Sequence, residues 1–552
     1  MRFLAQKSTL RQTKSDAVAV FVLQNKRHFE TQIQNLTKTL RLPIANIVKL
    51  ERFAGKEGEL VQLYTERKLA APRLIIVGLG ELEKLTLERM RCAAAAAAKK
   101  AEQLKAKSIA FNLPQIPSDG FRESVEDVAQ AIVEGSVLSL YKFDKYLTEK
   151  KKKEGKLSYV SVFHPHRLVF QQIKSGVGMG RAVCEAVYHA RDLENAPSNE
   201  IYPESLAAAA RDAAAKYGFQ TIVWDKKRIE REGFGGLLGV SSGSARPPVF
   251  IIMEYHGRED KVPPLVLIGK GITFDAGGIS IKPSAGMAEM KMDMSGAAAV
   301  IGTMEVAARL KLPVNLVGLV PATENMPSGS ALKPGDIVRH YGGKTSEVVD
   351  TDAEGRLILA DALAYAAKYK PAAVVDLATL TGACVVALGH HATGMMGNDE
   401  ELMGKLKRAG EKTYERVWQL PLFEEYEKQI KSDVADVKNL GGKWAGAITA
   451  ALFLKKFVKD CKWVHLDIAG PAILDEDLPY TPKGGSGVGV RLVVELLRVW
   501  GALNGWQRHR KRMSSSSAEA GYLSEPWGRW KSETTEPVQC RGVRLSSSPP
   551  VP

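Results

Sequence analysis

The sequence predicts an α/β protein with a small N-terminal α/β domain and a larger C-terminal α/β domain, whose mostly parallel central sheet is covered by helices. Short apolar runs that do not alternate with polar residues indicate strands buried on both faces of a sheet. Stretches with helical periodicity separate many of these runs, as the connections of a parallel sheet require. The length of 552 residues is enough for two or more domains at ~100–200 residues each.

The first domain is predicted to span residues 1–170. Its clearest elements are two strands and two helices, at residues 17–23, 73–78, 81–105 and 124–138. A lysine-rich run at 150–155 is expected to form a solvated loop. A linker helix is predicted at 171–195, with its clearest helical pattern at 180–193, and it ends where a Pro- and Ser-containing segment breaks the pattern.

The second domain is predicted to span residues 196–501. Six strands are expected, at residues 219–224, 249–253, 264–269, 314–320, 373–378 and 463–468. Five helices are expected, at residues 204–217, 295–310, 355–369, 445–458 and 488–500. Ligands of parallel α/β sheets bind beyond the carboxyl ends of the strands, so we expect functional residues just after Leu267, Leu377 and Leu466. Residues 502–552 lack apolar periodicity and are expected to form a disordered tail.

The composition excludes several classes of protein. Hydrophobic residues make up 45% of the chain and charged residues 25%, which is typical of a globular protein and not of a disordered, collagen-like or coiled-coil chain. No apolar run approaches the ~20 residues of a membrane helix, and the first residues contain no apolar signal region. The five cysteines are scattered and never in Cys-x-x-Cys spacing, which favours a reducing compartment. We therefore expect a cytoplasmic protein without a membrane segment.

The net charge of +15 is concentrated in the first domain. Residues 1–170 carry 30 Lys and Arg against 18 Asp and Glu, an excess of 12 positive charges, whereas residues 171–501 are close to neutral. This excess leaves nucleic-acid binding open as a second function. Lysine-rich helix faces in water are the favoured interpretation, because no aromatic interleaving or nucleic-acid motif accompanies the charge.

Two polar, glycine-containing segments of the second domain carry the recognisable chemistry. The first follows the strand predicted at 264–269 and contains Lys270, Asp275, Lys282 and Asp293. The second opens a predicted helix and reads Asp350-Thr351-Asp352-Ala353-Glu354-Gly355-Arg356-Leu357. Carboxylates that converge in a dry site repel one another, and divalent cations, which favour carboxylate oxygens, would remove that repulsion.

The lysines and the spacing of the acids fit a site of this kind. In an extended stretch, residues i and i+2 face the same side, so Asp352 and Glu354 can reach one centre. A lysine beside two dications can lose its proton and become a ligand, whereas a lysine slightly farther away stays charged and can polarise a carbonyl. The alternative is a set of surface ion pairs at helix N-termini, which leaves both glycine-containing loops unexplained.

The second segment resembles the signature of the leucyl aminopeptidase family, the two-metal cytosolic aminopeptidases, which reads Asn-Thr-Asp-Ala-Glu-Gly-Arg-Leu. Only Asp350 differs, which places an extra potential charge beside the expected ligands. Segments 270–293, 376–382 and 465–470 resemble other parts of the same family, and the resemblance covers essentially residues 1–501.

The resemblance implies metal-binding roles for five residues of the two segments. Asp275 and Glu354 would bridge two metal ions. Asp352 would complete the coordination of one ion, and Lys270 and Asp293 would complete that of the other. Mn and Zn are the favoured metals, with Mg and Co as alternatives, because an oxygen-rich site with one lysine does not select among them.

The resemblance also implies the catalytic residues and the substrate pocket. Lys282 would polarise the scissile carbonyl, and Arg356 would anchor a bicarbonate ion that serves as general base. The pocket for the first side chain of the substrate would be lined by Met290, Thr379, Gly382, Ala469 and Ala472. Because this pocket is largely apolar, Leu-like or Met-like first residues are expected.

The implied protein is a leucyl aminopeptidase, a metallo-exopeptidase that hydrolyses N-terminal amino acids from peptides through a hydroxide bridging two metals. The resemblance further implies a homohexamer with the small domains on the outside. A catalytically inactive homologue is the remaining alternative, and the intact Lys282 and Arg356 argue against it. The sequence leaves open the metal at each site, the exact substrate and the role of the tail.

Overall fold

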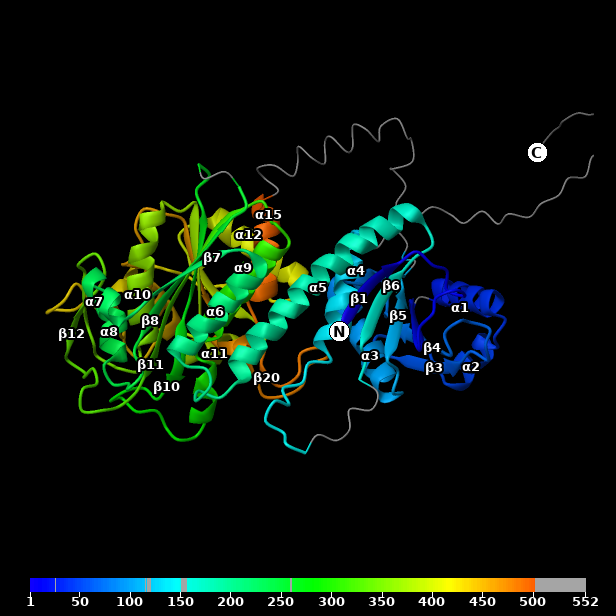
Figure 1. Cartoon of the computed structure of the whole chain (residues 1–552), viewed down its shortest axis with the longest axis horizontal. Helices are drawn as coiled ribbons and strands as arrows, with labels where there is room; N and C mark the ends of the chain where they lie inside the picture. The colour runs from blue at the N-terminus through cyan, green and yellow to red at the C-terminus, as the bar shows by residue number, and fades with distance from the viewer. Residues whose placement is uncertain (25, 115, 117–120, 150–155, 259–260, 502–552) are drawn as a thin grey trace, which may run out of the picture.

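The computed structural model describes residues 1–24, 26–114, 116, 121–149, 156–258 and 261–501. Two α/β units lie side by side, each built on its own sheet, and a long helix passes between them (Figure 1). The predicted α/β class, with a smaller N-terminal unit and a larger C-terminal one, is therefore confirmed. The run at 150–155 and the tail at 502–552 lie outside the described residues.

The N-terminal sheet is mixed. Its six strands, in spatial order, are β1 (Arg2–Gln6), β6 (Tyr159–Phe163), β5 (Ser108–Asn112), β2 (Ala17–Val22), β4 (Arg73–Gly78) and β3 (Leu60–Tyr64). All neighbours are parallel except β3 and β4. Strand β2 is buried along its whole length because helices cover both faces of the sheet, which explains its continuous apolar run.

The C-terminal sheet is mostly parallel, as predicted. Eight strands form its path, in the order β16 (Val417–Gln419), β15 (Thr393–Gly397), β18 (Trp463–Asp467), β14 (Ala373–Ala378), β9 (Leu265–Gly269), β11 (Asn315–Asn325), β8 (Val249–His256) and β7 (Gln220–Trp224). The central strands β18, β14, β9 and β11 are parallel. The antiparallel pairs lie toward the two edges, where β15 pairs with β18 and β8 pairs with β7 and β11.

One further strand, β10 (Gly271–Asp275), carries the chain beyond the edge of this sheet. It follows β9 after the single residue Lys270 and pairs in parallel with the end of β11. At Lys270 the backbone N–H turns to the carbonyl of Leu377 on β14. The break in the strand places Lys270 at the carboxyl edge of the sheet and carries Asp275 past it.

Helices form layers on both sheets. The first unit contains α1 (Lys26–Leu40), α2 (Ile44–Leu50), α3 (Leu87–Gln103) and α4 (Val125–Leu138). The second contains α6 (Pro203–Tyr217), α7 (Lys226–Glu232), α8 (Gly235–Ser241), α9 (Ser295–Arg309), α10 (Gly355–Ala366), α11 (Gly382–Leu388), α12 (Glu400–Thr413), α13 (Gly446–Lys455), α14 (Ala469–Ala472) and α15 (Val490–Gly501). Helices α8, α10 and α13 share a core on one face of the large sheet, and α6, α9 and α15 cover the other.

Short elements complete the chain. They are the strands β12 (Ile337–Arg339), β13 (Thr345–Glu347), β17 (Val437–Lys438), β19 (Ile473–Leu474) and β20 (Gly484–Gly485), and the 3-10 turns η1 (Leu82–Lys84), η2 (Met287–Met292), η3 (Ala367–Tyr369) and η4 (Glu424–Ile430). None of the described helices is both long and apolar enough to cross a lipid bilayer.

Helix α5 (Arg167–Asn195) joins the two units and begins four residues before the linker helix predicted at 171–195 (Figure 1). Its glycines weaken helix propensity but allow close packing. A Cβ at Gly176 would lie 2.2 Å from the carbonyl oxygen of Glu126 on α4, and a Cβ at Gly180 would lie 2.9 Å from the Val133 side chain. These glycines let α5 approach α4 closely, so packing overrides the propensity that the sequence shows.

Buried polar contacts fix the two units relative to each other. Arg91 on α3 bonds Glu134 on α4 at 2.7 Å and the carbonyl of Lys412 on α12 at 3.0 Å. Tyr480 donates to Glu88 at 2.8 Å. Arg91 and Glu134 are almost wholly buried and pair within the first unit, so separating the units would break the bonds from Arg91 to Lys412 and from Tyr480 to Glu88.

Most of the predicted strands and helices are present, with ends that differ by a few residues. Strands β1, β3, β5 and β6 of the small sheet were not predicted. Nor were the edge strands β15 and β16 of the large sheet and the amphipathic helix α12 between them. The omitted strands have three to five residues, too few for a period of two to stand out in the sequence.

The C-terminal end of α5 holds the loop at 484–487. Glu194 accepts a hydrogen bond from the N–H of Gly487 at 2.9 Å, and Asn195 accepts one from Gly485 at 3.0 Å. Ser486 in turn donates from its N–H to the carbonyl of Ala472 at 2.9 Å. Glu194 is fully buried, and burial raises the pKa of this carboxyl to about 8.

We predict that Glu194→Gln changes the pH dependence of stability. The wild-type carboxyl keeps its proton up to about pH 8 in the folded state but has an ordinary pKa of 4.5 when unfolded, so stability falls as the pH rises between these values. The glutamine variant lacks this loss. The unfolding free energy of the variant minus that of wild type should rise by about 2–4 kcal/mol between pH 5 and 8. Above pH 8 this difference should not change further. Thermal melts across the range measure the difference, and a constant difference would contradict the assignment.

Candidate metal centre

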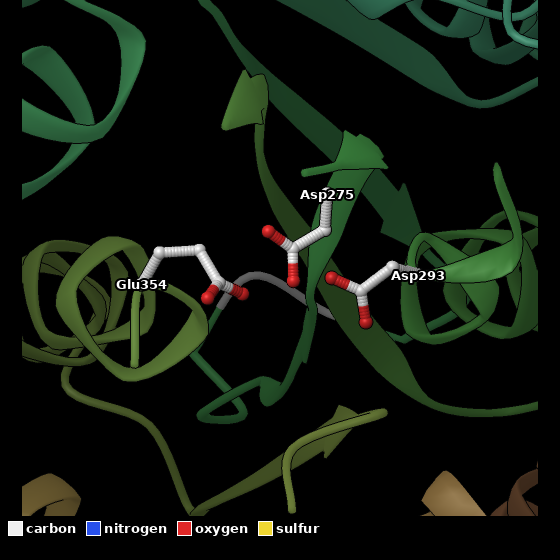
Figure 2. Close-up of side chains that lie close together, drawn as sticks. All are labelled: Asp275, Asp293 and Glu354. Atoms are coloured by element: carbon white, nitrogen blue, oxygen red, sulfur yellow. The ribbon is translucent and has the colours of Figure 1, made fainter. Parts of the chain in front are cut away.

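Three buried carboxylates converge at the carboxyl edge of the large sheet. Asp275 ends β10, Asp293 follows η2 and precedes α9, and Glu354 directly precedes α10. One carboxylate oxygen from each lies within 4.8 Å of the others. Figure 2 shows the three carboxyl groups pointing toward one another. The site lies where the parallel arrangement of the strands predicted a ligand-binding region.

Asp275 is oriented by its neighbours. Its Oδ1 accepts hydrogen bonds from the N–H of Gly277 and from the side-chain amide of Asn325, both at 2.9 Å. Gly277 has a φ of +89°, which favours glycine, so the loop can turn back beneath the carboxylate. Asn325 also donates to the carbonyl of Thr351 at 3.0 Å. This amide therefore joins the two ligand-bearing segments.

Lys270 lies among the three acids. Its ammonium is 2.7 Å from Asp293 and 2.9 Å from Glu354, and it donates to the carbonyl of Thr379 at 2.9 Å. The side chain passes directly over Gly355, where a Cβ would lie 2.5 Å from the lysine Cε. A glycine at this position, the first residue of α10, is therefore required for the approach of Lys270.

Asp352 and Lys282 lie closer to solvent. The Lys282 ammonium is 2.5 Å from Asp352 and 2.9 Å from Asp275, and its side chain is 21% exposed. Asp350 accepts a hydrogen bond from the N–H of Asp352 at 2.9 Å. The oxygen of an asparagine could accept the same bond, so the departure from the signature preserves this contact.

Burial dominates the electrostatics of the acids. It raises the pKa of Glu354 to about 8, with repulsion from Asp275 as the next cause, and it raises the pKa of Asp293 to about 6. Burial alone would lower the pKa of Lys270, but Asp293 and Glu354 outweigh it, so the pKa of Lys270 is raised. Without metal, the lysine thus offsets part of the negative charge as an ammonium ion.

The donor set fits hard or borderline divalent cations. Carboxylate oxygens and a lysine nitrogen are the atoms that converge, and the Glu354 Oε2 is buried without a hydrogen-bond partner among the described residues. A buried carboxylate oxygen without a hydrogen-bond partner destabilises the folded protein unless a cation binds it. Lys270 could join as a ligand only in its neutral form, so metal binding would have to displace its proton.

Arg356 lies in the first turn of α10, 5% exposed. Its Nη1 donates to the carbonyl of Asn439 at 2.8 Å, and its Nε has no hydrogen-bond partner among the described residues. Burial lowers the pKa of the guanidinium, which nevertheless stays charged at neutral pH. The Nε–H of the buried Arg356 guanidinium could therefore donate a hydrogen bond to an anion.

The residues predicted to line the substrate pocket lie on four segments. Met290 is on η2, Thr379 follows β14, Gly382 begins α11, and Ala469 and Ala472 bound α14. Thr379 contacts the acidic cluster directly, donating from its hydroxyl to Asp293 at 2.7 Å. Helices α11 and α14 contact each other, which places Gly382 and the two alanines on neighbouring elements.

Asp467 at the end of β18 connects two of these segments. One of its oxygens accepts from the Thr381 hydroxyl at 2.7 Å, and the other accepts from the N–H groups of Leu380 and Ala469, each at 3.2 Å. No role was predicted for Asp467 or Asn325. Each is the last residue of its strand, at the carboxyl edge of the sheet, and that position was the available signal.

Comparisons with known proteins agree with this geometry. Residues 17–150 match the model of the cytosol aminopeptidase family, N-terminal domain, and residues 188–494 match that of the cytosol aminopeptidase family, catalytic domain. A probable cytosol aminopeptidase of a Geobacter species is 48% identical over 455 residues, covering 82% of this chain and 91% of that protein. One from Syntrophotalea carbinolica is 46% identical over 485 residues, covering 88% and 97%.

Solved structures share the fold. A tomato leucine aminopeptidase variant superimposes with a TM-score of 0.79 at 33% identity, covering 90% of this chain and 96% of the other. The bottromycin maturation enzyme BotP in complex with Mn gives a TM-score of 0.77 at 33% identity, covering 88% of this chain and 100% of that one. A structurally similar protein therefore binds manganese.

We predict that Asp275→Ala and Glu354→Ala each lose metal. Both carboxylates point toward the other acids of the cluster (Figure 2), so removing either leaves fewer oxygens to bind a divalent cation. Purified variants should hold fewer than two Mn²⁺ per chain by elemental analysis and should lose nearly all activity. The surface variant Asp336→Ala is the control. A variant that keeps two metals and near-normal turnover would refute the ligand assignment.

Proposed function

The chain belongs to the cytosol aminopeptidase family, a family of metallo-exopeptidases, and we propose that it releases the N-terminal residue of peptides at the acidic cluster in the cytosol. The observation that carries the proposal is the convergence of three buried carboxylates and Lys270 at one edge of the sheet. The relatives named cytosol aminopeptidases support both the activity and the compartment.

We propose that five residues hold two divalent cations, Mn or Zn in the first place, with Mg or Co as alternatives. Asp275 and Glu354 are the proposed bridging ligands, and Lys270, which pairs with Asp293 and Glu354, would join Asp293 in completing one site. Asp352, which is partly exposed and pairs with Lys282, would complete the other site. When bound, the cations would supply Lewis acidity toward a water molecule and the scissile carbonyl.

Lys282 is the residue proposed to bind the substrate carbonyl. Its ammonium pairs with Asp275 and Asp352 and its side chain is partly exposed, so Lys282 borders both the cluster and solvent. Burial alone would lower the pKa of Lys282, but Asp275, Glu354 and Asp352 outweigh it and raise the pKa, so the residue stays charged. A fixed cation there would stabilise the negative charge that develops on the carbonyl oxygen.

Arg356 is proposed to anchor bicarbonate as the general base. The guanidinium is buried, held on one side by the carbonyl of Asn439, and has an unused Nε. Bicarbonate bound there would accept a proton from the attacking water and return it to the leaving amine. Arg356 itself keeps its proton and positions the anion.

The substrate class follows from the pocket and the cluster. Met290, Thr379, Gly382, Ala469 and Ala472 are proposed to receive the first side chain, and their small or apolar character favours Leu-like and Met-like residues. A free α-amine would bind at the metal centre, which restricts cleavage to the first residue. A homohexamer is proposed from the family resemblance alone, and nucleic-acid binding by the basic N-terminal unit stays a prediction.

Lys282→Ala should reduce kcat rather than metal content. The lost ammonium acts on charge that develops in the transition state, so kcat on a leucine amide should fall by roughly 10²–10³. Lys282→Arg, which retains a cation, should recover part of the rate. Elemental analysis should give the same metal content for all three proteins. Loss of metal in Lys282→Ala would make this lysine a ligand.

Arg356→Ala should remove the response to bicarbonate. Water or another anion can partly replace bicarbonate, so the basal rate should fall less than in Lys282→Ala. Rates measured with increasing bicarbonate should rise for wild type and stay flat for the variant, while Arg356→Lys keeps a partial response. A wild-type response in Arg356→Ala would exclude the arginine from the general-base role.

A further inference from the structure

Asn439, directly after β17, is fully buried and lies against the ligand-bearing segment that precedes α10. Its Oδ1 accepts hydrogen bonds from the N–H groups of Val349 at 2.7 Å and Asp350 at 3.3 Å. Its Nδ2 donates to the carbonyls of Asp350 at 2.7 Å and Ala353 at 3.3 Å. Some 86 to 90 residues of sequence separate it from these partners.

These four bonds use the full capacity of the amide. A carboxamide has two N–H donors and one oxygen that accepts two bonds, and here each is matched to a backbone group of the same short segment. The pattern fixes the orientation of the amide, because the oxygen faces N–H groups and the nitrogen faces carbonyls. An aspartate or a leucine, although similar in size, could not bond both the N–H groups and the carbonyls of this segment.

The backbone of Asn439 adds two contacts. Its N–H donates to the carbonyl of Glu347 on β13 at 2.9 Å, which ties it to the small sheet of β12, β13 and β17. Its carbonyl accepts from Arg356 Nη1 at 2.8 Å. One residue therefore contacts the segment that carries Asp352, the residue before Glu354, and the guanidinium of Arg356.

We propose that Asn439 is a positioning residue that holds the 349–354 segment and Arg356 in the arrangement that metal binding requires. The proposal rests on the proposed function, because it assigns Asn439 to the support of that same centre. Asp352 and Glu354 lie on either side of Ala353, whose carbonyl the amide holds. Without the amide, metal binding itself would have to order the carboxylates of Asp352 and Glu354, and this would lower the affinity of the site for the metal ions.

Asn439→Asp tests the amide without changing its size. The oxygen facing Val349 and Asp350 is retained, whereas the NH₂ is replaced by an oxygen that faces two carbonyls. Asn439→Ala removes both sets without adding charge. Asn315→Asp is the matched control, since Asn315 is also a buried asparagine whose amide bonds the backbone, but it lies at the far end of the 11-residue strand β11.

Titration of metal-free protein with Mn²⁺, followed by the EPR signal of free Mn²⁺, gives affinity without reference to turnover. Both Asn439 variants should bind Mn²⁺ about 10–100-fold more weakly than wild type, as for other residues that orient metal ligands. At saturating Mn²⁺ most of kcat should return. Asn315→Asp should lower Tm and leave the Mn²⁺ affinity unchanged.

The outcomes separate the two proposals. Wild type that binds fewer than two Mn²⁺ and does not cleave a leucine amide overturns the proposed function. Wild type that does both, beside Asn439 variants with wild-type affinity, overturns only the positioning role. If neither Asn439 variant folds, or if Asn315→Asp weakens Mn²⁺ binding equally, Asn439 acts on the fold as a whole and the proposal is wrong.

Discussion

The cost of burying negative charge is the constraint on which the C-terminal unit depends. Asp275, Asp293 and Glu354 are each at least 93% buried, and their repulsion raises the folding cost unless cations offset it. Lys270 supplies one cation, and two dications would supply the rest. Several features of the fold bring these charged groups together at the carboxyl edge of the sheet. They are the break between β9 and β10, the glycine at 355 and the starts of α9 and α10.

The surrounding protein holds these groups by backbone hydrogen bonds and buried amides. Asn325 bonds Asp275 and the Thr351 carbonyl, so it sets the distance between two segments that begin on different strands. Asp467 performs the same task for the segments proposed to receive substrate. The second layer of polar residues is buried as deeply as the proposed ligands, which explains how a loop-built site can be rigid.

Much of this was predictable from the sequence, and the exceptions have physical causes. The buried strands of the large sheet and the two acidic segments were predicted because each is local: an apolar run, or carboxylates spaced among glycines. The start of α5 was predicted to within four residues, but the sequence did not show why glycines stand at 176 and 180, since their close contacts with α4 form only in the folded chain. Asn325 and Asn439 were missed because their partners are remote in sequence and only the folded chain brings them together.

Anomalous diffraction from crystals grown with Mn²⁺ tests the central claim most directly, since it locates each cation independently of activity. Two peaks per chain should appear, both within coordination distance of Asp275 and Glu354, with Lys270 and Asp293 on one ion and Asp352 on the other. Lys282 should lie outside both coordination shells. A single peak, or two peaks that do not share Asp275 and Glu354, would contradict the account.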